Sequence, residues 1–362
     1  MLVSDLLSAL FAAAPAALAE EWDNVGLLAG DARQEVSGIL VCLDATLPAL
    51  EAATASGANL VVAHHPLFLK PQAAFTPSGD TWPAWEACRR GLSVICMHTN
   101  LDSAPGGLAD EAAAMLGLLD SRPLAPAGRG ALQKLVVFVP RSHQEQVLAA
   151  ISEAGAGVIG KYDYCSFAAP GTGTFRAQPG AQPYLGKVGE IERAEEVRLE
   201  TVLPRAIAGR VVRAMLAAHP YEEVAFDLYH LENAWPGAGL GRLGRLPETM
   251  AAGEFMEHVS RVFGAPVRAA GGPERIGEVA ILPGGGGRAV PEAAAAGADA
   301  LVTGDAGHHD AQAAVDRGIL LVAVGHYRTE IPAVPLLARL CRAAAPRIEV
   351  REYLETNPWK RE

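Results

Sequence analysis

Short, uninterrupted apolar segments recur along this chain and constrain its fold more than any other feature. Residues 38–43, 59–63 and 92–97 are apolar runs of strand length, separated by segments with helical patterns. Strands that are apolar throughout are buried on both faces, as in parallel sheets covered by helices. The alternation of such strands with helices predicts an α/β fold with a mostly parallel sheet.

The same alternation returns near the C-terminus, with apolar runs at residues 279–282, 300–302 and 319–324. Between the two regions the chain has Pro- and Gly-rich segments and a strand and helix order of β-α-β-β-α-β, which is the ferredoxin-like pattern. We therefore predict a discontinuous α/β core domain, residues 1–127 and 241–362. An inserted α+β domain would occupy residues 128–240.

Charge and composition exclude several classes of protein. The 362 residues carry a net charge of −11, whereas general nucleic-acid binding needs clustered lysine and arginine. No segment reaches the roughly 18–20 apolar residues of a membrane span. The apolar residues 6–19 lack a preceding positive charge, which favours a helix over a signal peptide. The five cysteines form no C-x-x-C pair, which indicates free thiols in a reducing compartment. We expect a cytoplasmic protein.

Histidine and acidic residues follow the apolar segments, where open α/β sheets place their chemistry. If the strands lie parallel in one sheet, these side chains emerge along one edge. Imidazole and carboxylate without thiolate suit Zn, Fe(II), Mn, Co or Ni. His326 and Glu330 are four residues apart and would share one face of a helix. The residues at the strand ends are His64, His65, His98, Asp102, Asp305, His308, His309 and His326.

His64 and His65 are adjacent, and adjacent side chains of a regular strand point to opposite faces. They can share a site only if the strand ends there, or if two metal ions flank it. Asp102 and Glu330 could each bridge, so up to two ions fit. Two ions roughly 3.5–4 Å apart would lower the pKa of a bridging water toward 7.

Three features leave alternatives open at this stage. His98 either ligates a metal itself or hydrogen-bonds to a metal-ligating side chain and orients it. His308 and His309 either line the pocket or only begin a helix. The four glycines at positions 284–287 either present backbone amides to an anion or form a flexible turn. No serine lies in a Gly-x-Ser-x-Gly elbow, so acyl-enzyme chemistry has no support.

Several motifs together resemble the NIF-three-like dinuclear-metal family, also described as GTP cyclohydrolase type 2 homologues. The resemblance extends over essentially the whole chain. Residues 162–167, 171–175 and 218–224 are similar to the PII/CutA-like insert of the longer members. The core motifs are residues 21–27 (Glu-Trp-Asp-Asn-Val-Gly-Leu), 64–67 (His-His-Pro-Leu), 98–102 (His-Thr-Asn-Leu-Asp), 303–305 (Thr-Gly-Asp) and 325–330 (Gly-His-Tyr-Arg-Thr-Glu).

The resemblance implies two divalent metal ions per subunit, held by His64, His65, Asp102, His326 and Glu330. It also implies a homohexamer built as a trimer of dimers. The implied activity is hydrolysis of a nucleotide-like or phosphorylated small molecule by metal-activated hydroxide, with His98 or Glu330 moving the proton. The alternative is a non-enzymatic metal-handling or regulatory hexamer, in which the insert binds a partner or an effector.

Overall fold

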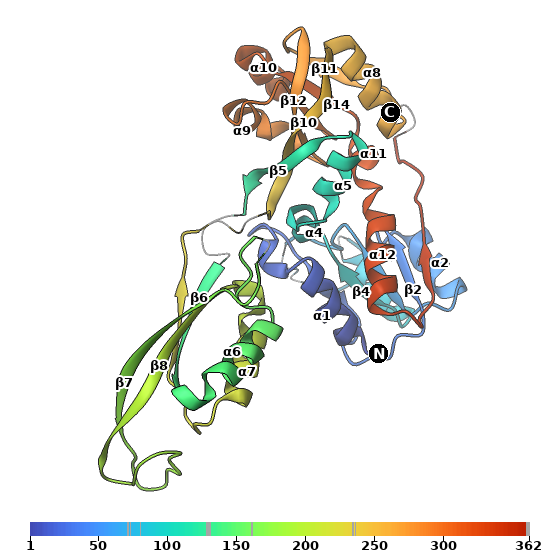
Figure 1. Cartoon of the computed structure of the whole chain (residues 1–362). Helices are drawn as coiled ribbons and strands as arrows, with labels where there is room; N and C mark the ends of the chain where they lie inside the picture. Colours follow the sequence, from blue (N-terminus) through green and yellow to red (C-terminus); the bar gives the residue numbers. More distant parts are fainter. Residues whose placement is uncertain are drawn as a thin grey trace. The chain divides into compact units, whose positions relative to one another are not determined.

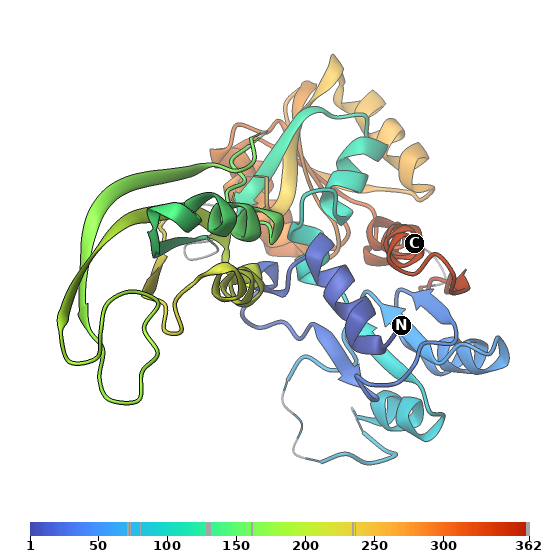
Figure 2. The ribbon, with the colours of Figure 1, turned by 60° about the horizontal axis from the view of Figure 1, so that its bottom comes forward.

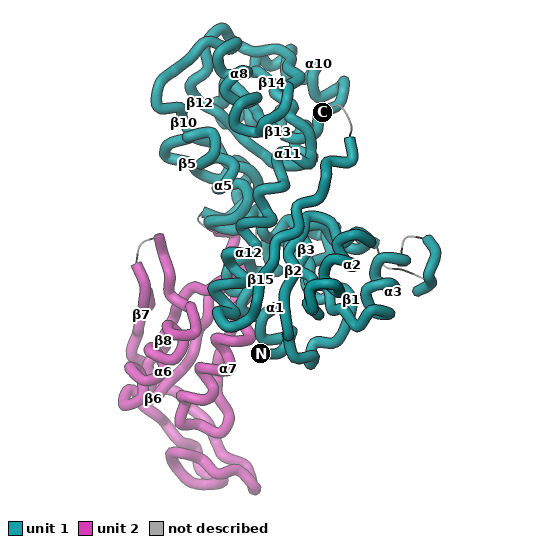
Figure 3. Tube along the Cα trace, turned by 90° about the vertical axis from the view of Figure 1, so that its right-hand side faces the viewer, with its two compact units in different colours: residues 1–126, 237–362 teal, residues 127–236 magenta. Residues whose placement is uncertain are grey.

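The computed structural model describes residues 1–70, 72, 74–79, 81–127, 132–160, 162–233, 235 and 237–359. The chain divides into two compact units (Figure 3). Unit 1 combines Met1–Pro126 with Gly237–Glu362, and unit 2 is Ala127–Pro236. Each unit is described separately below.

Unit 1 contains two sheets, and the first is built mainly from the N-terminal segment. Its central strands are buried along their whole length, which explains their uninterrupted apolar sequence. Neighbouring strands are parallel except that β1 is antiparallel to β4. In spatial order the strands are β1 (Gly26–Ala29), β4 (Ser93–Cys96), β3 (Leu60–Ala63), β2 (Ile39–Cys42) and β15 (Val350–Glu352).

The second sheet of unit 1 is built mainly from the C-terminal segment. Its three central strands β14, β13 and β12 are parallel, and the flanking pairs are antiparallel. In spatial order the strands are β11 (Arg268–Ala270), β14 (Leu320–Ala323), β13 (Ala300–Thr303), β12 (Arg275–Leu282), β10 (Gly239–Ala251) and β5 (Leu119–Pro126).

Helices cover both sheets. Apolar residues of α2 and α3 pack on the first sheet, and those of α5 and α8 pack on one face of the second, opposite α9 and α10. The helices of unit 1 are α1 (Val3–Ala13), α2 (Leu47–Ala55), α3 (Trp82–Arg89), α4 (Thr99–Ser103), α5 (Leu108–Met115), α8 (Ala252–Phe263), α9 (Val290–Ala295), α10 (His308–Arg317), α11 (His326–Glu330) and α12 (Ala333–Ala344), with 3-10 turns at Ala16–Leu18 and Gly286–Ala289.

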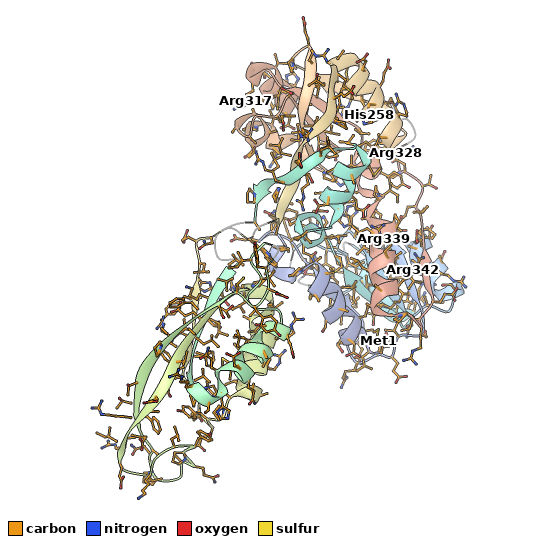
Figure 4. All side chains as sticks on the ribbon, viewed as in Figure 1. Met1, His258, Arg317, Arg328, Arg339 and Arg342 are labelled. Atoms are coloured by element: carbon orange, nitrogen blue, oxygen red, sulfur yellow. The ribbon has the colours of Figure 1, made fainter. Side chains whose placement is uncertain are left out.

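Helix α12 connects the two sheets of unit 1. It lies beside α1 (Figures 1 and 2) and packs on β2 and β15. Two arginines along α12 are labelled in Figure 4. Arg339 forms an ion pair with Glu111 of α5, and Arg342 reaches Glu352 of β15 at 2.9 Å. Helix α12 therefore contacts a strand of the first sheet and a helix that packs on the second.

One expectation about the core was wrong. The core strands do not form a single sheet: the C-terminal strands pair with β10 and β5 in a second sheet, and β15 pairs with β2 in the first. β5 is an edge strand, where Pro123 and Pro126 are tolerated because one side needs no partner.

Unit 2 has one four-stranded sheet with the order β7-β8-β6-β9, and every neighbouring pair is antiparallel. Two helices cover one face, where their apolar residues form a separate core. The β7–β8 hairpin is long and curved (Figures 1 and 2). The elements are β6 (Leu132–Pro140), α6 (Gln144–Glu153), β7 (Ser166–Arg176), β8 (Ile191–Pro204), α7 (Ala208–Ala218) and β9 (Phe226–His230), with 3-10 turns at Arg141–His143 and Arg205–Ile207.

Within the described ranges, no helix has the length and apolar character needed to cross a membrane. The five cysteines are all free, and three of them are buried.

A candidate metal centre between two sheets

The predicted site residues converge in unit 1, although they come from two sheets. β3 ends at Ala63, and β4 ends shortly before His98 and the short helix α4. β14 ends at Ala323, and α11 begins three residues later at His326. Neighbouring imidazole centroids lie 5.2–5.7 Å apart. The six residues brought together are His64, His65, His98, Asp102, His326 and Glu330.

His64 and Asp102 form a buried pair with no hydrogen bond between them. The Nδ1 atom of His64 is 2.8 Å from the Met97 carbonyl oxygen and donates to it, so Nε2 carries a lone pair. That Nε2 lies 3.6 Å from Asp102 Oδ1, and neither atom has a hydrogen-bond partner among the described residues. Burial lowers the pKa of His64 to about 3. Burial, with Glu330 nearby, raises the pKa of Asp102 well above its usual value.

Glu330 accepts hydrogen bonds from two imidazoles. Its Oε2 atom lies 2.8 Å from His65 Nε2 and 2.9 Å from His326 Nε2. Burial acts to lower the pKa of His65, but hydrogen bonds to Asp44 and Glu330 outweigh it and raise that pKa to about 10. The hydrogen bond to Glu330 raises the pKa of His326 to about 9. Burial would raise the pKa of Glu330, yet these two histidines hold it well below its usual range.

His98 lies at the edge of this cluster and is oriented by Asp23. Its Nδ1 atom is 2.8 Å from Asp23 Oδ1, and Thr99 donates its backbone N–H to the other carboxylate oxygen. Burial acts to raise the pKa of Asp23, but the hydrogen bonds to His98 and Thr99 lower it to about 2. Trp22 meets the His98 ring edge-on at 6.0 Å. The ionised Asp23 fixes the His98 tautomer, so that Nε2 is the atom left for ligands or protons.

Three acids behind the imidazoles are therefore part of the site. Asp23 anchors His98, Asp44 lies 2.9 Å from His65 Nδ1, and Asp305 lies 2.6 Å from His326 Nδ1. Neither Asp23 nor Asp44 was among the site residues predicted from the sequence. The family motif at residues 21–27 was the available signal for Asp23, and position at a strand end was the signal for Asp44.

These residues fit divalent metal ions. His64 Nε2 and Asp102 Oδ1 are buried without a hydrogen-bond partner and lie 3.6 Å apart, and a cation bound between them would satisfy both atoms. At Glu330, one divalent ion could replace two imidazolium protons without changing the charge. The ligand atoms form two groups, and within each group they lie within 4.8 Å of one another. One group is His64, His65 and His98, and the other is His65, His326 and Glu330. Cys96 lies nearby, but burial raises its pKa and keeps it a thiol, so the donors are imidazole and carboxylate.

The adjacent histidines no longer pose a geometric problem. β3 ends before His64, so the strand's alternation of faces does not apply to the two side chains. Their rings are tilted by 40° with centroids 5.2 Å apart. His65 belongs to both groups of ligand atoms, whereas His64 belongs to one.

Three of the four glycine amides after β12 are engaged by the protein itself. Gly284 donates its N–H to Thr329, Gly286 to Thr303 and Gly287 to the Asp305 carbonyl. Amides that are already engaged cannot bind an anion. A side chain at position 284 would place its Cβ 2.0 Å from Glu330 Oε1, so this turn lets the backbone approach the carboxylate.

His308 and His309 begin α10 and lie outside both groups of ligand atoms. Their rings contact each other, with centroids 5.4 Å apart. Asp305, from the same connection, reaches the site through His326.

A cavity of about 470 Å³ opens onto the cluster. No lysine or arginine is among the described residues that line it. Around the imidazoles and carboxylates the walls are apolar, formed by Trp22, Pro66, Leu69, Leu240, Leu282 and Pro283.

Comparison with known proteins matches this chain to one family along its whole length. The family model described as Duf34/NIF3 (NGG1p interacting factor 3) matches residues 1–358. The chain belongs to the DUF34/NIF3 family. This confirms the resemblance stated from the sequence motifs.

Relatives in this family share the full extent of the chain. A Halalkalibacterium halodurans protein named GTP cyclohydrolase 1 type 2 homolog is 41% identical over 86% of this chain and 85% of its own length. A Mycobacterium bovis protein of the same name is 39% identical over 99% of this chain and 96% of its own. The solved structure of a Bacillus cereus protein related to NIF3 matches with a TM-score of 0.86 and 36% identity, covering 99% of this chain and 98% of that one. The mixed α/β architecture is therefore that of the family.

Proposed function

We propose that this DUF34/NIF3 protein is a divalent-metal-dependent hydrolase acting on a nucleotide-like or phosphorylated small molecule. The observation that carries the proposal is the pair of unpartnered buried atoms, His64 Nε2 and Asp102 Oδ1, 3.6 Å apart beside a carboxylate that accepts from two imidazoles. The substrate class follows the relatives' name, GTP cyclohydrolase 1 type 2 homolog.

In this proposal the site would hold two ions with His64, His65, Asp102, His326 and Glu330, and Glu330 would bridge. Bound divalent ions supply Lewis acidity and lower the pKa of water. The cavity lining has no lysine or arginine among its described residues, so a phosphate group would meet only imidazoles and bound ions as positive partners there. The apolar wall that includes Trp22 suits a planar ring.

His98 is the residue we assign to proton transfer. Asp23 holds its Nδ1, which leaves Nε2 to accept or donate a proton at the cavity. Asp44 and Asp305 hold the rings of His65 and His326 from behind, so these imidazoles are oriented before a ligand arrives.

The test is turnover by the full-length chain loaded with Mn, Fe(II) or Zn against a panel of nucleotides and phosphoesters. We expect turnover with at least one metal, lost in His64→Ala and Glu330→Ala. His308→Ala is the matched control, because His308 lies outside both ligand groups, and it should keep activity and metal content. If no metal supports turnover that depends on His64 and Glu330, the hydrolase proposal is wrong.

A second candidate is a non-enzymatic, metal-handling or regulatory hexamer. It is supported by unit 2, whose β-α-β-β-α-β order with two helices on one face of the sheet we interpret as a ferredoxin-like insert. In that case no metal-loaded form should show turnover, and chelation should dissociate the oligomer or lower its melting temperature. Analytical ultracentrifugation with and without chelator tests the proposed trimer of dimers directly.

A further inference from the structure

Unit 2 has a cavity of its own, with a volume of about 530 Å³. Its described lining residues all come from unit 2, so it is separate from the imidazole–carboxylate site. The proposed hydrolase function does not use it. Its walls combine aromatic rings with glutamates.

Three aromatic residues form one side of this cavity. Tyr221, which follows α7, is central: its ring centroid lies 6.2 Å from that of Phe175 on β7 and 5.9 Å from that of Tyr184 in the β7–β8 connection. The rings are inclined by 57° and 45° to Tyr221, so they are not stacked flat against one another. Tyr184 is 49% exposed, which leaves ring surface for a ligand.

A fourth ring shows what these surfaces attract. Phe138 also lines the cavity, and the guanidinium of Arg198 lies over it at 5.7 Å from the ring centroid. Aromatic faces carry a negative electrostatic potential and bind cations within about 6 Å. Phe138 is thus in contact with a cation of the protein. Among the described residues, the rings of Phe175, Tyr184 and Tyr221 have no such lysine or arginine contact.

The glutamates of the lining are held in place by neutral groups. Glu196 on β8 accepts from the Tyr221 hydroxyl at 2.9 Å through one oxygen. Its other oxygen lies over Gly173 of β7, where an added Cβ would be 2.0 Å away. Glu222 accepts from the backbone N–H of Gln182 at 2.9 Å.

The described lining is therefore predominantly negative, with three glutamates and one arginine. Glu223 also faces the cavity, and Arg176 is the one basic residue among the described lining residues. The ion pairs formed between described residues of unit 2 use Lys134, Arg198 and Glu200, not these three glutamates. Carboxylates that form none of these ion pairs, beside partly exposed aromatic rings, favour a positively charged organic ligand.

We propose that this cavity of unit 2 binds a small organic ammonium ion of the aliphatic polyamine class. The methylene segments pack on the faces of Phe175, Tyr184 and Tyr221, and the ammonium groups pair with Glu196, Glu222 and Glu223. A phosphate-bearing ligand is disfavoured, because it would meet three carboxylates.

The test is isothermal titration calorimetry of the full-length protein with spermidine, and with heptane-1,7-diol as a neutral probe. Spermidine should bind and the diol should not. The double variant Glu222→Gln/Glu223→Gln should weaken spermidine binding by about 2- to 30-fold, because two exposed ion pairs are lost. Tyr221→Leu should also weaken it by about 2- to 30-fold, the range for losing one cation–ring contact.

Glu190→Gln/Glu195→Gln is the matched control, because it also removes two negative charges, from exposed residues outside the cavity lining. It should leave the affinity unchanged. If Tyr221→Leu fails to fold by circular dichroism, Tyr184→Leu replaces it, because that ring is half exposed. His64→Ala should bind spermidine as the parent does, which separates this site from the metal centre. Absence of spermidine binding at millimolar concentration, equal binding of the diol, or an unchanged affinity in the double glutamate variant overturns the proposal.

Discussion

Replacing Gly284 by alanine tests whether the backbone at this turn shapes the metal centre. Gly284 has φ +67°, and an added Cβ would lie 2.0 Å from Glu330 Oε1. The residue cannot move aside easily, because its N–H donates to Thr329 Oγ1 at 3.0 Å and its carbonyl accepts from the Asp305 N–H at 2.8 Å. The Glu330 carboxylate must therefore shift.

The expected cost has two parts. A non-glycine residue in the left-handed region costs about 1–2 kcal/mol, and an overpacked buried site costs about 1–3 kcal/mol. Together these destabilise the protein by about 2–5 kcal/mol, or roughly 5–15 °C in melting temperature for a domain of about 250 residues. Displacing Glu330 should also lower the affinity for Mn or Zn at least tenfold, since about 1.4 kcal/mol corresponds to a factor of ten.

Thermal melts with excess chelator measure the first effect, and competition with a fluorescent metal indicator measures the second. Gly285→Ala is the control, because that residue has φ −83° and its added Cβ meets nothing within 4 Å. It should change stability by no more than about 0.5 kcal/mol. If Gly284→Ala matches Gly285→Ala in both melting temperature and metal affinity, the close approach to Glu330 has no energetic consequence and the reasoning fails.

Two further outcomes are expected. Arg242 is buried and pairs with Asp110, so Arg242→Met should destabilise the protein by about 3–5 kcal/mol in urea melts. Arg245 on the same strand is exposed, so Arg245→Met should lower the free energy of unfolding by at most about 1 kcal/mol. Equal losses in the two variants would contradict the burial argument. The pKa values of His65 and His326 are raised to about 10 and 9, so both imidazoles are protonated at neutral pH and must lose their protons to bind an ion. Metal affinity should rise with pH by roughly tenfold per pH unit for each proton released: two protons below about pH 9 and one between about 9 and 10. Calorimetry in buffers of different ionisation enthalpy should detect the release of two protons at pH 7. No release would contradict the assignment.

Local sequence pattern was sufficient for the buried strands and for the polar residues that follow them. The uninterrupted apolar run of β3 ends at Ala63, directly before His64, where the strand ends and the site begins. We expected Asp102 and Glu330 to meet along one edge of a single sheet, whereas the structure brings their connections together from two sheets. The presence of a second sheet did not follow from local pattern, since pairing of β5 with β10 depends on contacts between segments more than a hundred residues apart.

The outer residues of the site were harder to predict for the same reason. Asp23 and His98 are 75 residues apart in the chain, and no periodicity connects them. The need for glycine at position 284 depends on where the Glu330 side chain ends, which only tertiary packing decides. Sequence could say that a carboxylate was present, but not which imidazole it would hold.

The distance along the chain between the site residues has a consequence for biosynthesis. His65 and Glu330 are separated by 265 positions, and all of unit 2 lies between them. During synthesis, His64, His65 and His98 therefore leave the ribosome long before Glu330, the carboxylate that accepts hydrogen bonds from two of the site's histidines. An ion that needs Glu330 as a ligand therefore cannot be held until residue 330 has been made, after the whole of unit 2.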